Sequence, residues 1–103
     1  WPLKPYSILH SAFEEVMLID ADNVVVRDPA YLFDAPEYRA AGALFWPDYE
    51  RLAPDRAIWR LCGVPWRDEE EIESGQLLIH KRRSWRPLNL TMHLNEHSDF
   101  YSQ

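Results

Sequence analysis

The sequence predicts an α/β fold in which helices flank a small parallel or mixed sheet. Three short apolar runs, at residues 16–20, 42–46 and 75–80, are bounded by charged or turn-forming residues, as buried strands are. Segments with helical spacing separate these runs. The alternation of strands and helices indicates a layered α/β architecture.

In the first half of the chain, apolar and aromatic residues at helical spacing predict a helix over residues 4–12, and Pro5 suits its first turn. The run VMLID at 16–20 is rich in strand formers and predicts a buried strand of the parallel type. Residues 28–41 combine two prolines with local helical spacing, which indicates short turns.

Further along the chain, residues 42–46 predict a second buried strand that Pro47 closes, and residues 54–63 predict a helix that Gly63 stops. The acidic segment that follows predicts irregular structure as far as residue 74. The run at 75–80 predicts a third strand. Residues 81–101 predict a last helix, interrupted or started near Pro87.

Length and charge limit the possible functions. With 103 residues the chain is sufficient for one domain, and its net charge of -6 disfavours binding to nucleic acid. No apolar run approaches the roughly 18 residues that a membrane span needs. The chain begins without methionine, so we expect residues 1–103 to be a fragment of a longer protein. Such a fragment should have an open sheet edge near the strand at 16–20.

Two carboxylates, Asp20 and Asp22, follow the first apolar strand. Ligands of α/β sheets bind beyond the carboxyl ends of strands, and strand alternation would point both side chains to one side. Hard oxygen ligands suit Mg²⁺ or Mn²⁺, whose remaining ligands come from water and a substrate's phosphates. The alternative is that both aspartates only cap a turn or a helix start.

The segments FEEVMLIDADNVVVRDPAYLFD, GALFWPDY and ESGQLLIHKRRSW resemble the fungal alpha-1,3-mannosyltransferase family and its alpha-1,2 relatives. DADN, FWPD and ESGQ, in this order and spacing, carry the resemblance, which extends from about Lys4 to Tyr101. It implies a retaining, nucleotide-sugar-dependent glycosyltransferase with a GT-A type fold. In that fold a Rossmann-like mixed sheet is flanked by helices. The resemblance implies that residues 1–103 are the central part of a single glycosyltransferase catalytic domain, present here as a partial domain.

The resemblance also implies roles for residues at the end of the first strand. Asp20 would face the donor's ribose and the metal, and Asp22 would hold the Mn²⁺ or Mg²⁺ on the donor diphosphate. Asn23 would belong to the donor site. Lys4 matches a family lysine and would reach the donor's phosphates or sugar, although it also fits a solvated helix-start lysine.

The ESGQ and FWPD motifs would serve the sugar end of the site. Glu73 and Gln76 would be catalytic, Ser74 would bond sugar hydroxyls, and Gly75 would let the backbone approach the donor. Asp48 would bind donor or acceptor hydroxyls. The alternative reading of ESGQ is a strand-entry turn, and that of Asp48 is a turn carboxylate.

The resemblance further implies GDP-mannose as donor, a glycan as acceptor and the Golgi lumen as location. The protein would be a type II membrane protein anchored by segments outside this chain. One departure is His80, which stands where the family often has an acidic residue. Two alternatives stay open: an aspartyl-phosphate phosphatase, because DADNV fits its DxDx(T/V) pattern, and a carbohydrate-binding relative without turnover.

Overall fold

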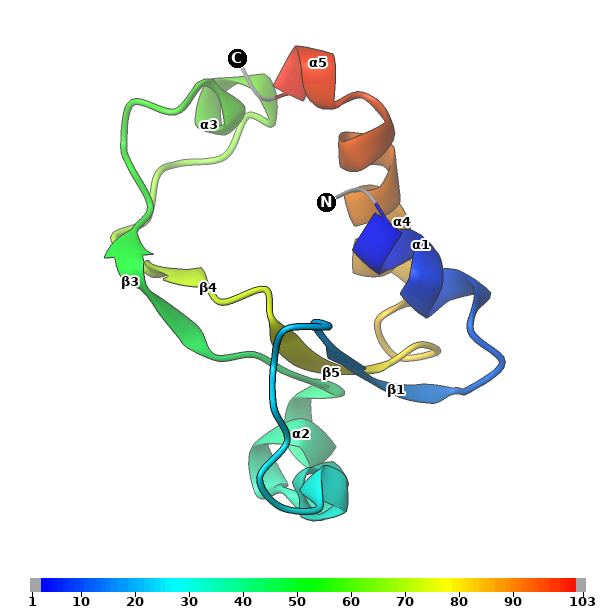
Figure 1. Cartoon of the computed structure of the whole chain (residues 1–103). Helices are drawn as coiled ribbons and strands as arrows, with labels where there is room; N and C mark the ends of the chain where they lie inside the picture. The colour runs from blue at the N-terminus through cyan, green and yellow to red at the C-terminus, as the bar shows by residue number, and fades with distance from the viewer. Residues whose placement is uncertain (1–2, 102–103) are drawn as a thin grey trace.

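The computed structural model describes residues 3–101, which form a mixed α/β structure with two small sheets (Figure 1). The larger sheet has the strand order β1-β5-β2. These strands are β1 (Glu15–Ile19), β5 (Gln76–His80) and β2 (Ala43–Leu44). Both pairings are antiparallel, so the prediction of a parallel or mixed sheet is wrong for the described part of the chain. The apolar run of β5 reflects a central strand covered on both faces, and this says nothing about strand direction.

One face of the larger sheet packs against two helices. These are α1 (Leu3–His10) and α4 (Trp85–Glu96), which lie side by side in Figure 1. Ile8 of α1 and Leu88 of α4 form a buried cluster with Ile79 of β5. Pro5 and Pro87 lie in the first turns of these helices, where a missing N–H costs little. The two helices confirm the predictions for residues 4–12 and 81–101.

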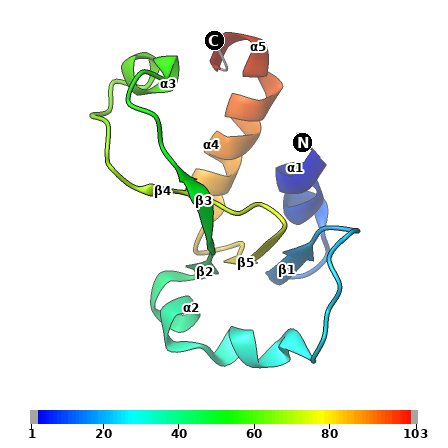
Figure 2. The same cartoon turned by 60° about the vertical axis from the view of Figure 1, so that its left-hand side comes forward.

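The opposite face of the sheet is covered by a 3₁₀ helix, η1 (Pro29–Asp34), and by α2 (Pro36–Ala41) (Figure 2). Tyr38 of α2 is only 1% exposed, and its hydroxyl donates a 2.8 Å hydrogen bond to Glu15 Oε2 on β1. Burial, followed by the contact with Glu15, raises the pKa of Tyr38. Gly42 ends α2 with a φ of 75°, a conformation that glycine adopts readily.

A second, two-stranded sheet corrects two predictions. It pairs β3 (Pro47–Arg51) with β4 (Glu70–Ile72) in antiparallel fashion. Pro47 therefore begins a strand instead of closing one, and the acidic segment contains a strand. The ribbon is largely exposed, and arginines neutralise its carboxylates: Arg51 contacts Asp68 at 2.7 Å, and Arg56 contacts Glu71.

Two short helices lie at the other end of the molecule from the larger sheet (Figure 1). They are α3 (Ala57–Leu61) and α5 (Ser98–Tyr101), which contact each other. The expected helix at 54–63 is confirmed in its central part, with Gly63 just beyond it at a φ of 64°. No helix described between residues 3 and 101 is long and apolar enough to cross a membrane.

The first strand, β1, forms one edge of the larger sheet, because it pairs only with β5 within the described residues. The prediction that this strand lies at an edge is therefore confirmed. Large apolar side chains are also exposed directly after it: Val24 is 85% exposed and Val26 is 92% exposed. Solvated valines beside an open edge mark a surface that other protein segments commonly cover.

Candidate functional site

The side chain of Lys4 joins three segments that are distant in sequence. From α1, its Nζ donates to Asp20 Oδ2 at 2.7 Å, to the Ser74 carbonyl at 2.8 Å and to Ser74 Oγ at 3.2 Å. The Lys4 side chain is 19% exposed and that of Asp20 is 26% exposed. This ion pair is half-buried, so solvent screens it less than an ordinary surface pair.

The carbonyl of Gly75 joins the DADN turn to the ESG turn. It accepts 2.8 Å hydrogen bonds from the backbone N–H of Asp20 and from the side-chain amide of Asn23. The backbone N–H of Asn23 in turn donates to the Asp20 carbonyl at 3.0 Å, which closes the turn after β1. Both motifs are therefore held together by backbone and side-chain bonds.

Two side chains lie so close to Gly75 that a larger residue there would displace them. A Cβ there would lie 2.9 Å from Glu73 Oε1 and 3.0 Å from Asn23 Nδ2, shorter than a carbon and a polar atom normally approach. The same Glu73 carboxylate accepts the backbone N–H of Gly75. The close neighbours of Gly75 in this structure are protein side chains, and the approach of its backbone to the donor stays a prediction.

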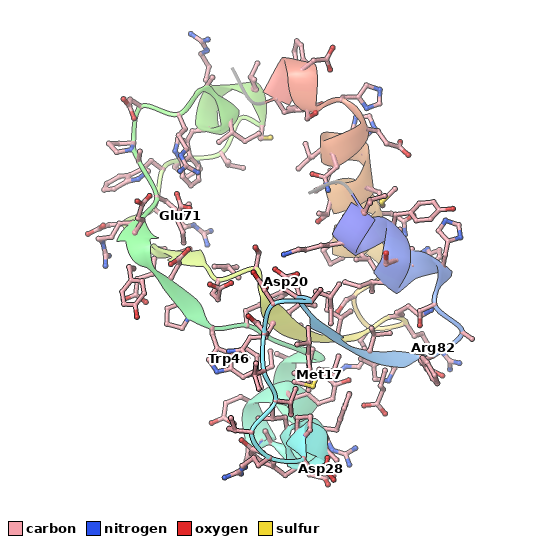
Figure 3. All side chains as sticks on the ribbon, in the orientation of Figure 1. Met17, Asp20, Asp28, Trp46, Glu71 and Arg82 are labelled. Atoms are coloured by element: carbon pink, nitrogen blue, oxygen red, sulfur yellow. The ribbon has the colours of Figure 1, made fainter. Side chains whose placement is uncertain are left out.

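We call these six residues the motif cluster: Lys4, Asp20, Asn23, Glu73, Ser74 and Gly75. It lies at the carboxyl end of β1 and the amino end of β5, where Ile19 pairs with Gln76. Figure 3 labels Asp20 at this end of the strand and Arg82 at the far end. Because β1 and β5 pair in antiparallel fashion, the DADN turn that follows β1 lies beside the ESG turn that precedes β5.

The other predicted site residues lie around the motif cluster or apart from it. Gln76 opens β5 and lines a cavity that Asn23 also lines. Asp22 is exposed in the turn after β1. Asp48 lies in β3, where its carboxylate accepts the N–H of Tyr49 at 2.7 Å. Within residues 3–101, no hydrogen bond or ion pair joins Asp48 to the motif cluster.

The orientation expected for the two aspartates rested on strand alternation, and this part of the prediction is wrong. β1 ends at Ile19, and Asp20 to Asn23 form a turn, so the alternation of a strand does not set their directions. In the described part of the chain, no group of three or more His, Cys, Asp or Glu side chains is placed to hold a metal.

Two cavities flank the motif cluster on opposite faces of the sheet. One, of about 220 Å³, lies between α1, β5 and α4 and is lined at one end by Lys4. The other, of about 270 Å³, lies under the loop that follows Asp22. Its lining includes Met17, Asn23, Arg27, Tyr31, Trp46 and Gln76. Figure 3 labels Met17 and Trp46 on the side of the sheet that faces α2.

Sequence reasoning did not single out Arg27 or Tyr31 of the second cavity. The Arg27 guanidinium carbon lies 3.9 Å from the centroid of the Tyr31 ring, within the range of a cation–π contact. No local pattern indicates this pair, because Arg27 precedes η1, which begins at Pro29.

Residue His80 ends β5, and its Nδ1 is buried without a hydrogen-bond partner among the described residues. Its Nε2 lies 3.8 Å from Glu14 Oε1. Because β5 runs away from the ESG turn, His80 lies at the opposite end of that strand from Gln76. The departure at position 80 therefore lies outside the motif cluster.

Comparison with known proteins identifies similar sequences. Residues 1–60 match the model of a family described as "Mannosyltransferase putative". Alpha-1,2-mannosyltransferase MNN22 of Candida albicans is 29% identical over 80 residues, which cover 78% of this chain and 14% of MNN22. From the same organism, alpha-1,2-mannosyltransferase MNN21 is 25% identical over 131 residues, 89% of this chain and 20% of MNN21. A protein named "Putative alpha-1,3-mannosyltransferase MNN14" is 32% identical over 87 residues, 82% of this chain and 13% of MNN14.

The chain spans only 14% of the length of MNN22 and 20% of that of MNN21. The match to MNN21 extends over 131 residues, more than the 103 of this chain, so that relative carries residues within the matched region that have no counterpart here. No solved structure gives a significant match, and the GT-A topology stays a prediction.

Proposed function

This chain belongs to the fungal mannosyltransferase family, and on that basis we propose that it forms part of a glycosyltransferase catalytic domain. The enzyme moves mannose from a nucleoside-diphosphate donor to a glycan acceptor. One observation supports this above all. The Lys4 ammonium and the Gly75 carbonyl bond the DADN turn and the ESG turn into one polar cluster at the carboxyl end of β1.

The donor set at the strand end suits a hard divalent cation in part. Asp20 and Asp22 offer carboxylate oxygens, the ligand type that Mg²⁺ and Mn²⁺ prefer. Such ions usually take one or two protein carboxylates and complete their shell with water and substrate phosphates, so a full protein shell is not needed. When bound, the cation would neutralise charge on the leaving diphosphate.

Protein side chains take the remaining roles. Lys4, already within 2.7 Å of Asp20, is placed to exchange this ion pair for a phosphate oxygen. Glu73 and Ser74 would contact the transferred sugar, as would Gln76 from the cavity under the loop. Asn23 would hold the turn that presents Asp22, because its amide is bonded to the Gly75 carbonyl.

Three finer assignments belong to this proposal. The donor is GDP-mannose, the reaction retains the anomeric configuration, and the enzyme works in the Golgi lumen as part of a type II membrane protein. The phosphatase alternative is not favoured, because the reported relatives are all mannosyltransferases and β5 ends in His80 instead of the Ser or Thr which that chemistry needs.

The full-length protein incubated with GDP-mannose, Mn²⁺ and a mannoside acceptor tests the proposal. We expect a product one hexose heavier by mass spectrometry, and release of GDP in equal amount. UDP-glucose in place of GDP-mannose controls for donor choice. Release of inorganic phosphate from a phosphomonoester would favour the phosphatase. Donor binding without any product, under conditions that fold the protein, would favour the relative without turnover.

A further inference from the structure

An arginine of the cavity under the loop has an unused hydrogen-bonding edge. Arg27 stacks on the Tyr31 ring at 3.9 Å and makes no hydrogen bond or ion pair within residues 3–101. Most other arginines of the described chain bond a carboxylate or a backbone carbonyl. These are Arg39, Arg51, Arg56, Arg67, Arg82 and Arg83. Arg27 is exposed, and its N–H groups are accessible to a ligand.

The location of Arg27 limits the kind of ligand that its guanidinium could bind. Arg27 lines the cavity of about 270 Å³ that Asn23 and Gln76 also line, and Asn23 directly follows Asp22 in the chain. Two other arginines without a described bond, Arg60 and Arg86, lie on α3 and α4. Among the arginines of residues 3–101, only Arg27 combines an unused guanidinium with a place in the lining of this cavity.

The charge around the DADN turn is net negative, so a nucleoside diphosphate that binds there needs cationic contacts. Asp20, Asp22 and Glu73 contribute three carboxylates, and Lys4 contributes one ammonium. A nucleoside diphosphate entering with a divalent cation would still bring surplus negative charge. A guanidinium fork matches the geometry of phosphate oxygens and binds them through charge-assisted hydrogen bonds.

We propose that Arg27 binds a phosphate oxygen of the donor's diphosphate, and that Tyr31 is the positioning residue that holds the guanidinium in place. This rests on the proposed function and adds a second phosphate contact on the side of the sheet opposite Lys4. Lys4 lines the cavity on the α1 and α4 face, and Arg27 lines the cavity on the α2 face. The diphosphate would therefore lie across the DADN turn between the two cations.

Calorimetry of the full-length protein with GDP and Mn²⁺, and with guanosine as a probe that lacks phosphates, tests Arg27. We expect Arg27→Ala to weaken GDP binding about tenfold or more, as loss of a charge-assisted bond implies, and to leave guanosine binding unchanged. Arg27→Lys should restore only part of the affinity, because the fork is lost. Arg86→Ala, which removes an exposed arginine from α4, is the matched control and should bind GDP like the wild type.

Variants of Tyr31 separate positioning from a structural role. Tyr31→Phe keeps the ring face and should bind GDP as the wild type does, whereas Tyr31→Leu should weaken GDP but not guanosine. If Arg27→Ala binds GDP normally while Asp22→Ala does not, the assignment of Arg27 is overturned and the proposed function stands. If the folded wild type binds no nucleoside diphosphate in a panel that includes GDP and UDP, both are overturned.

Discussion

The side-chain amide of Asn23 and the carbonyl of Gly75 lie 2.8 Å apart, although 52 residues separate them in the chain. The same carbonyl accepts the N–H of Asp20, so one backbone oxygen organises the turn that presents the aspartates. Both donors depend on the ESG backbone passing close to the end of β1. The absence of a side chain at position 75 makes this approach possible, since a Cβ would contact Asn23 and Glu73.

Replacing Gly75 by Ala should therefore damage the site more than the fold. The two atoms that a Cβ would contact are the ends of flexible side chains, so they would move aside and lose hydrogen bonds worth about 1 kcal/mol each. We expect a modest fall in melting temperature and a much larger fall in mannose transfer. Gly63→Asn is the control, because that glycine has open space around it and asparagine tolerates its positive φ. Full transfer activity in folded Gly75→Ala would contradict this role.

Replacing Asp22 by Ala should uncouple the metal from the nucleotide. If donor phosphates complete the shell of a cation held by this carboxylate, Mn²⁺ should strengthen GDP binding in the wild type and not in the variant. Loss of one such electrostatic partner typically lowers the rate by ~10² to 10³. Calorimetry with and without Mn²⁺ measures the coupling, and Asp55→Ala, an exposed carboxylate elsewhere, is the control. Equal GDP affinity with and without metal in the wild type would refute the metal site.

The kinds of element could be predicted from local sequence, whereas their pairing could not. The apolar run of β5 predicted a buried strand, and Leu78 is fully buried. Burial on both faces is common to parallel strands and to a central antiparallel strand, so direction stayed undetermined. The β4 strand was missed because its acidic residues lack an apolar alternation. The ion pair of Arg56 with Glu71 in this strand joins residues that are 15 apart in the chain, so no local sequence pattern shows it.

The sequence could predict that most of the candidate residues lie close together, and it could not predict their geometry. The motifs indicated which residues belong together, and six of them meet in the motif cluster. Their directions depend on where β1 ends, and it ends one residue before Asp20. The contact between Lys4 and Ser74 depends on how α1 packs on the sheet. Arg27 was missed because its contact with Tyr31 and its place in the cavity lining exist only in the folded chain.

Replacing Gln76 by Ala should impair transfer more than nucleotide binding. Gln76 lines the cavity under the loop and, in the proposed function, contacts the sugar beyond the diphosphate. We expect a large fall in kcat with an unchanged Kd for GDP, and no change in the pairing of Gln76 with Ile19, since that uses the backbone. Gln76→Glu, similar in size, shows whether the amide is needed. Unchanged turnover in a folded Gln76→Ala protein would leave the motif with a structural role alone.

Removing the Tyr38 hydroxyl should change how stability depends on pH. Burial and Glu15 raise the pKa of Tyr38, whereas an unfolded chain releases this proton near pH 10. Above that pH the unfolded state binds fewer protons than the folded one, so the stability contributed by Tyr38 is fully present below pH 10 and is lost as the pH rises toward the folded pKa.

Tyr38→Phe loses the hydrogen bond to Glu15 and should be less stable than the wild type by about 1 kcal/mol at neutral pH. The difference should shrink as the pH rises above about 10. Urea unfolding at pH 7 and near pH 11 measures both values. Tyr49→Phe, at a fully exposed tyrosine, should match the wild type at each pH. A difference for Tyr38→Phe that stays constant across this range would show that the proton on Tyr38 is not linked to folding.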